Sequence, residues 1–178
     1  AIAAPQSVRD EFDFADDRIP MNAANLCPSP RRLSAEVTRY TQLIDVDPSF
    51  QNRDQFAHHL ETSRAAVAGQ LGIKTDEVAL VRNTSEANNI VNAGINLKSG
   101  DEIVIWEQNH PTNHVAWAVR AQRYGVVVRT VTVPAQPMSV DDLIAPFEEA
   151  ITSKTRVLTV THVSNVSGLK LPIGELAR

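Results

Sequence analysis

Apolar residues recur at helical spacing along the first half of the chain. Residues 31–45 carry an apolar side chain every three or four positions, which predicts an amphipathic helix. The positions that form this stripe are Leu33, Val37, Tyr40 and Ile44. The same spacing over residues 50–71 predicts the longest helix, which the segment Asp47-Pro48-Ser49 can cap and Gly72 should end. Residues 1–30 show few periodic signals and are expected to form an N-terminal arm and loop.

In the second half, short apolar runs alternate with helical patterns. The runs that predict strands are residues 78–81, 103–106, 126–131 and 157–161. The segments that predict helices between and after them are residues 84–93, 112–124 and 141–151. Such alternation predicts an α/β domain, with a mostly parallel sheet flanked by helices. Ligands of these folds bind at the carboxyl ends of the strands, which directs attention to the residues after Val81, Trp106 and Thr161.

Composition narrows the function classes. The chain has 178 residues, a formal net charge of −4 and a sequence pI of about 5.7. This acidic balance argues against a nucleic-acid-binding protein, which usually has a basic face. No apolar run approaches the roughly 18 residues of a membrane-spanning helix. The single Cys27 excludes an internal disulfide framework.

Hydroxyl side chains follow the first predicted strand. Asn83 or Thr84 is a suitable N-cap for the helix that begins there, and Ser85 comes next. A helix N-terminus has free N–H groups and the positive end of the dipole, so Thr84 and Ser85 can bind a phosphate group. Simple capping explains the same residues. No glycine-rich dinucleotide motif or P-loop occurs, which disfavours a Rossmann-like binding module.

Polar residues also follow two later strands. His110 comes after the second strand, directly before Pro111, and its ring can stack on a flat ligand or transfer protons. A metal site is a rival interpretation because His110 and His114 are four residues apart, but the sequence offers no third ligand. Asn165 follows the fourth strand and can donate its amide to a ring acceptor, although an ordinary turn explains it too. One planar, phosphorylated ligand would account for all three positions.

Together these segments resemble the class V aminotransferase family of fold-type I enzymes that use pyridoxal 5'-phosphate (PLP). The family includes cysteine desulfurases, isopenicillin N epimerase-like proteins and kynureninases. The segments that carry the resemblance are residues 22–24 (NAA), 82–89 (RNTSEANN), 98–104 (KSGDEIV), His110 and 161–165 (THVSN). The resemblance runs from about Met21 to Arg178. It implies that Thr84 and Ser85 bind the cofactor phosphate, His110 stacks on the pyridine ring and Asn165 bonds the phenolic oxygen. The loop at residues 22–25 is similar to the family's loop beside the active site, which makes Asn25 the candidate for substrate contact.

The resemblance also implies an activity. The family's cofactor forms a Schiff base with a lysine and serves as an electron sink for chemistry at the Cα of an amino acid. An aminotransferase or epimerase-like reaction is expected, with a cysteine desulfurase or lyase and a non-catalytic truncated fragment as the alternatives. No catalytic residue is assigned, because the family's lysine is expected beyond Arg178. Residues 31–178 are therefore expected to be the front portion of the large domain, and a second polypeptide that carries the rest is one alternative for the partner. The resemblance implies a homodimer in the cytoplasm, or in the periplasm after twin-arginine export.

Overall fold

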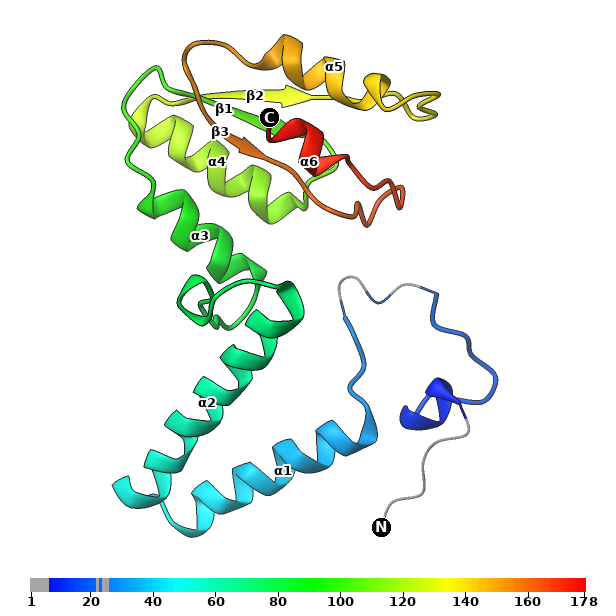
Figure 1. Cartoon of the computed structure of the whole chain (residues 1–178), viewed down its shortest axis with the longest axis vertical. Helices are drawn as coiled ribbons and strands as arrows, with labels where there is room; N and C mark the ends of the chain where they lie inside the picture. The colour runs from blue at the N-terminus through cyan, green and yellow to red at the C-terminus, as the bar shows by residue number, and fades with distance from the viewer. Residues whose placement is uncertain (1–6, 22, 24–25) are drawn as a thin grey trace. The chain divides into compact units, whose positions relative to one another are not determined.

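The computed structural model describes residues 7–21, 23 and 26–178. The chain divides into two compact units, Ala1–Leu80 and Val81–Arg178 (Figure 1). None of the helices in the described part of the chain is long and apolar enough to cross a membrane. The boundary between an arm and a domain that the sequence predicts at residues 30 and 31 stays a prediction.

The first unit is helical. Its elements are the short 3-10 helix η1 (Val8–Glu11), α1 (Arg31–Val46), α2 (Phe50–Leu71) and the 3-10 helix η2 (Thr75–Glu77). Both predicted helices are confirmed. Ser49 caps α2 by accepting a hydrogen bond from the Asn52 N–H at 3.2 Å, and Gly72 ends it with a left-handed φ of 69°. Only a residue without a Cβ adopts this φ without strain, which is why glycine marks the helix end.

The first unit has little core of its own. Of its described hydrophobic residues, Ala68 alone is buried. Arg31, the first residue of α1, holds the N-terminal arm by donating to the backbone carbonyls of Asp10 and Phe12 and to the Asp13 carboxylate. The helices of this unit thus follow local signals, because few tertiary contacts support them.

The second unit is an α/β layer structure. Its elements are α3 (Thr84–Gly94), β1 (Glu102–Trp106), α4 (Pro111–Tyr124), β2 (Val127–Val131), α5 (Asp141–Ala150), β3 (Thr155–Thr159) and α6 (Ile173–Leu176). The strands form a parallel sheet in the order β2-β1-β3, with β1 in the centre (Figure 1). The predicted fold class, a parallel sheet flanked by helices, is confirmed.

All five residues of β1 are buried, because helices cover both faces of the sheet. Val104 and Trp106 point to one face, where they pack with Phe147 of α5. Ile103 and Ile105 point to the other face and pack against Trp117 of α4. Successive strand residues face opposite sides, so a continuous apolar run is what a strand between two helical layers requires.

Two of the predicted strands need correction. Residues 78–81 form no strand: Val78 ends η2, and Leu80 and Val81 are 44% and 41% exposed. Their apolar character fits a strand, but a strand needs a hydrogen-bonding neighbour, and both neighbours of β1 are other segments. The last strand covers Thr155–Thr159, two residues earlier than the predicted 157–161, since backbone pairing with β1 extends into its polar start.

Candidate functional site

A neutral hydrogen-bond network joins the loops that follow β1 and β3. The side-chain oxygen of Gln108 accepts bonds from the hydroxyls of Ser164 and Ser167, at 2.7 and 2.6 Å. Gln108 lies two residues after β1, whereas both serines belong to the loop after β3. These two bonds therefore fix the second loop relative to the first at the carboxyl edge of the sheet.

Asn109 reinforces the same junction from inside the protein. Its side chain is 5% exposed, and its amide nitrogen donates to the Thr159 carbonyl at 2.8 Å and to the Asn113 side chain at 3.2 Å. Its oxygen accepts from the Thr161 hydroxyl at 2.8 Å. A buried amide with partners for both of its ends rigidifies what surrounds it. The loops that carry the candidate site residues thus rest on a fixed base.

His110 is the N-cap of α4 and is exposed. Its Nδ1 atom accepts the Thr112 N–H at 3.3 Å and lies 2.9 Å from the Thr112 hydroxyl oxygen. A ring nitrogen that accepts an N–H bond carries no proton, so these contacts favour the tautomer with the proton on Nε2. The capping interaction therefore sets both the ring orientation and the position of its proton.

The contacts of His110 and His114 do not support the interpretation that these two residues bind a metal ion. His114 turns its Nε2 atom to the Glu107 carbonyl at 3.1 Å, whereas His110 is held by Thr112. Within the described ranges, no group of three or more His, Cys, Asp and Glu side chains could hold a metal ion.

Thr84 and Ser85 are the first two residues of α3, and both are exposed. Asn83 is the N-cap, and its side-chain oxygen accepts the Glu86 N–H at 2.9 Å. The Glu86 carboxylate in turn accepts the Arg82 N–H at 2.7 Å. Because Asn83 does the capping, neither hydroxyl is needed for it, and the N–H groups of Thr84 and Ser85 have no partner inside the helix.

Asn165 lies in the turn after β3 and is exposed. The turn is closed by two backbone bonds: Gly168 N–H donates to the Ser164 carbonyl at 2.9 Å, and Ser164 N–H donates to the Leu169 carbonyl at 3.0 Å. Gly168 has a φ of 75°, which favours glycine. The turn places Asn165 next to Ser164, the residue that Gln108 binds.

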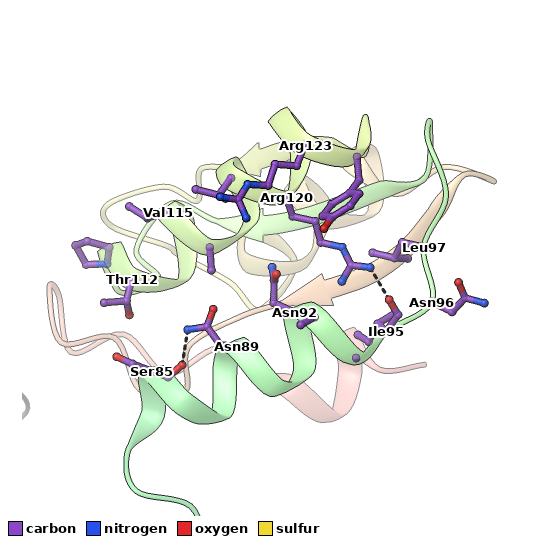
Figure 2. A pocket seen from close by; sticks show the side chains of 16 residues that line it. Ser85, Asn89, Asn92, Ile95, Asn96, Leu97, Thr112, Val115, Arg120 and Arg123 are labelled. Atoms are coloured by element: carbon purple, nitrogen blue, oxygen red, sulfur yellow. Dashed lines mark hydrogen bonds between the residues drawn. The ribbon is translucent and has the colours of Figure 1, made fainter.

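These contacts connect the segments that carry three of the four predicted cofactor ligands, namely Ser85, His110 and Asn165. Ser85 lines the same groove as Thr112, the partner of His110 (Figure 2). Asn165 belongs to the loop tied to Gln108, two residues before His110. Thr84 adjoins Ser85 at the helix start. Asn25, the candidate for substrate contact, lies outside the described residues.

Sequence reasoning missed the supporting residues Gln108, Asn109 and Thr112. Their partners Ser164, Ser167 and Thr159 lie 50 or more positions away from Gln108 and Asn109, so no local pattern announces these bonds. The available signal was the run of two amides that begins two residues after a buried strand.

The opposite, amino edge of the sheet is built from charged pairs. Glu102 is 5% exposed and accepts from Arg129 at 2.9 Å and from the Thr152 hydroxyl at 2.6 Å. These two hydrogen bonds, that from Arg129 first, lower the pKa of Glu102 below its ordinary value. Nearby, Asp101 lies 3.8 Å from Arg156. The carboxylates of Glu102 and Asp101 at this edge thus face arginine side chains of the same chain.

Comparison with known proteins decides the family. The profile of the family described as Aminotransferase class-V matches residues 30–178. The chain belongs to the class V aminotransferase family. The predicted resemblance is therefore confirmed over most of the sequence.

Relatives in this class V family carry two kinds of name. A probable cysteine desulfurase of Methanothermobacter thermautotrophicus is 30% identical over 97% of this chain and 43% of its own length. An isopenicillin N epimerase of Amycolatopsis lactamdurans is 31% identical over 88% of this chain and 40% of its own. The chain thus spans about two fifths of the length of these relatives.

Solved structures show the same fold. A cystine C–S lyase in complex with its reaction product cysteine persulfide has a TM-score of 0.79 at 22% identity, covering 85% of this chain and 40% of the lyase chain. A cysteine desulfurase of Escherichia coli has a TM-score of 0.68 at 26% identity, covering 85% of this chain and 39% of that one. The class V chain therefore has the α/β fold of these proteins.

Proposed function

We propose that this class V chain binds PLP at the carboxyl edge of its sheet and contributes to an enzyme that acts at the Cα of an amino acid. One observation carries the proposal: hydrogen bonds to Gln108 and Asn109 fix the loop of Asn165 to the loop of His110. Family membership supports it, since a related solved structure is described with glycine covalently linked to its PLP cofactor.

The residues present fit the chemistry of this cofactor. Its phosphate is a dianion, and the start of α3 offers it two exposed hydroxyls with the N–H groups of Thr84 and Ser85. Its aromatic ring is flat, and the exposed imidazole of His110 is flat and held in orientation by Thr112. Its phenolic oxygen is an acceptor, and the exposed Asn165 side chain carries an amide donor.

Each residue has a defined task in this proposal. PLP, when bound, supplies an electron sink for the carbanion that forms at Cα. Thr84 and Ser85 anchor the phosphate, and His110 stacks on the ring and keeps it in one plane. Asn165 donates a hydrogen bond to the phenolic oxygen, which favours the ionised form of that oxygen. The hydrogen bond from Ser164 to Gln108 holds the loop of Asn165 at the sheet edge, so the proposed cofactor-binding surface is preorganised.

The reaction is proposed as aminotransferase-like or epimerase-like, and the names of the relatives add a second candidate. Cysteine desulfurases and an isopenicillin N epimerase match this chain at similar identity. A desulfurase or lyase is therefore the alternative. Incubating the enzyme to which the chain contributes with PLP, L-cysteine and a thiol reductant, and measuring released sulfide, separates the two, because neither epimerisation nor transamination breaks the C–S bond.

Two matched variants test the cofactor site. His110→Ala removes the proposed stacking ring, whereas His114→Ala removes a second imidazole from the same helix, one turn further on and bonded to the Glu107 carbonyl. PLP is titrated into parent and variants, and its visible absorption is recorded. We expect His110→Ala to shift the absorption of added PLP, and His114→Ala to retain the parent's spectrum. Identical spectra for parent and His110→Ala would refute the assignment.

A further inference from the structure

A groove between α3 and α4 lies outside the residues assigned to the cofactor, apart from Ser85 at one end. It has a volume of about 1030 Å³, which is at the upper limit of the usual size of small-molecule sites. Figure 2 shows side chains of both helices entering the space between them, Asn92 from α3 and Arg120 from α4. The groove is a candidate binding site in its own right.

Two hydrogen-bond donors are buried at this groove without acceptors. Asn92 and Arg120 are 8% and 9% exposed. Arg120 donates one nitrogen, Nη2, to the Ile95 carbonyl at 2.5 Å and lies 5.8 Å from the Trp117 ring centre. Its other terminal nitrogen, Nη1, and the Asn92 amide nitrogen have no partner among the described residues. Leaving a buried donor unpaired costs about 1–3 kcal/mol, so an occupant that supplies acceptors would be favoured.

The charge of the groove selects the kind of acceptor. Arg120 and Arg123 both line it, and no Asp or Glu does. Nor does Arg123 form an ion pair with any residue in the described part of the chain. Apolar side chains complete the wall beside these cations: Leu97, Val115, Ala116 and Val119. The occupant should therefore combine one negative group with an aliphatic body.

We propose that the groove binds a small organic acid, with its carboxylate between Arg120 and Asn92. A carboxylate has two oxygens in one plane, so it can accept one bond from Arg120 Nη1 and one from the Asn92 amide. A guanidinium matches this planar geometry well. Phosphate has no aliphatic body to cover the apolar wall beside these donors. The aliphatic body of the acid lies against Val115 and Val119.

This site is distinct from the proposed cofactor site. Asn92 is seven residues beyond Ser85 on the same helix, which corresponds to about 10 Å along the axis. The proposal rests on the buried donors and not on PLP, so it can be tested in cofactor-free protein.

Calorimetric titration with hexanoate tests the proposal, with hexan-1-ol and inorganic phosphate as reference ligands. We expect hexanoate to bind, and both reference ligands to bind at least about tenfold more weakly, because they lack either the charge or the shape. In nuclear magnetic resonance spectra, the Asn92 amide and the Arg120 side-chain signals should shift on adding hexanoate. Failure of hexanoate to bind, or equal affinity for either reference ligand, would overturn the proposal.

Asn92→Asp sharpens the test, because it places a carboxylate of the protein itself beside Arg120. We expect this variant to bind hexanoate at least about tenfold more weakly while unfolding at a temperature no lower than the parent's. Asn89→Asp is the matched control: Asn89 also lines the groove, but its amide already donates to the Ser85 carbonyl at 2.8 Å. It makes the same charge change one turn earlier and should weaken binding by less than about threefold.

Two results would contradict the assignment. The first is equal weakening of hexanoate binding by Asn92→Asp and Asn89→Asp, since only the first residue has the buried free donor. The second is a fall in molar mass on adding hexanoate, measured by sedimentation, because it would assign the occupying carboxylate to another copy of the chain.

Discussion

Side chains join distant segments of the chain at both edges of the sheet, but the chemical groups that do so differ between the two edges. At the amino edge, Glu102 is paired with Arg129, and Asp101 lies near Arg156. At the carboxyl edge, the linking side chains are neutral amides and hydroxyls centred on Gln108 and Asn109. Both edges join segments that are far apart in the sequence, so both are structural.

The two edges also differ in which polar side chains remain exposed. At the amino edge, the carboxylates of Glu102 and Asp101 are engaged with Arg129 and Arg156. The carboxyl edge holds its loops with neutral groups and leaves the side chains of Ser85, His110 and Asn165 exposed. A ligand site needs polar groups that are positioned but still available. The comparison therefore supports the proposal that the carboxyl edge, besides joining distant segments, is the edge that binds a ligand.

The most decisive challenge to this division concerns the four lysines. Lys98 and Lys154 precede β1 and β3, at the amino edge, where the Lys154 carbonyl accepts the Glu102 N–H at 2.9 Å. Lys74 lies in the first unit, and Lys170 follows β3 in a loop. A lysine must lie at the site and be activated there to form a Schiff base with the cofactor. We expect none of the four to be labelled stoichiometrically when the 178-residue chain is mixed with PLP and reduced with borohydride.

Peptide mapping of the reduced protein reads this result directly. Scattered, substoichiometric labelling of surface lysines agrees with the prediction. Stoichiometric labelling of Lys170, together with turnover by the same chain, would contradict this prediction, and stoichiometric labelling of Lys98 or Lys154 would also contradict the division between the edges.

The next largest effect is expected at the start of α3. Ser85→Ala removes one hydroxyl donor from the proposed phosphate site, and one hydrogen bond to a charged group is worth about 1.5–3 kcal/mol. PLP affinity should therefore fall by about one to two decades. The control is Ser49→Ala, which removes the capping hydroxyl of α2 and should lower stability by about 1 kcal/mol without changing PLP affinity. Equal PLP binding by Ser85→Ala and the parent, measured by equilibrium dialysis, would remove the phosphate assignment.

A smaller, pH-dependent effect is expected at the amino edge. The hydrogen bond from Arg129 lowers the pKa of folded Glu102, so its contribution to stability is present above the unfolded pKa of roughly 4.3. That contribution is lost as the pH falls through the lower folded value. Glu102→Gln should therefore lower the melting temperature at neutral pH, and the gap to the parent should narrow below about pH 4.

Glu107→Gln is the matched control at the other end of the same strand. Glu107 is exposed and accepts a bond from the Thr132 hydroxyl at 2.7 Å. Thermal melts of both variants across pH should separate them. A gap for Glu102→Gln that stays constant down to pH 2 would show that its ionisation is not what stabilises this edge.

The sequence was informative where structure is set locally. Ser49 and Gly72 fixed both ends of α2, because a cap and a left-handed glycine act within one helical turn. Features that depend on pairing with a distant segment could not be predicted from the sequence. Residues 78–81 have a strand's composition but no neighbouring strand, and Thr155 joins β3 only because it pairs with Glu102.

The same distinction between local signals and distant contacts applies to the residues of the candidate site. His110 and Asn165 could be selected because each follows an apolar run, and parallel strands end at a common edge. That Gln108 would tie the loop of Asn165 in place could not be predicted, because the bond spans 56 positions. Side chains that meet only after folding carry no spacing pattern in the sequence.

The smallest expected effect, and the finest test of the carboxyl edge, is at Asn165. An amide that donates to the phenolic oxygen of bound PLP stabilises its ionised form and lowers its pKa. A hydrogen bond to the ionised oxygen is stronger than one to the neutral oxygen by about 1 kcal/mol, so Asn165→Ala should raise the pH of the cofactor's absorption change by roughly half to one unit. Asn96→Ala, which changes another exposed asparagine at the far end of the α3–α4 groove, should leave that pH unchanged. A spectroscopic titration of Asn165→Ala that overlays the parent's would show that the turn, although fixed by Gln108, does not present its amide to the cofactor.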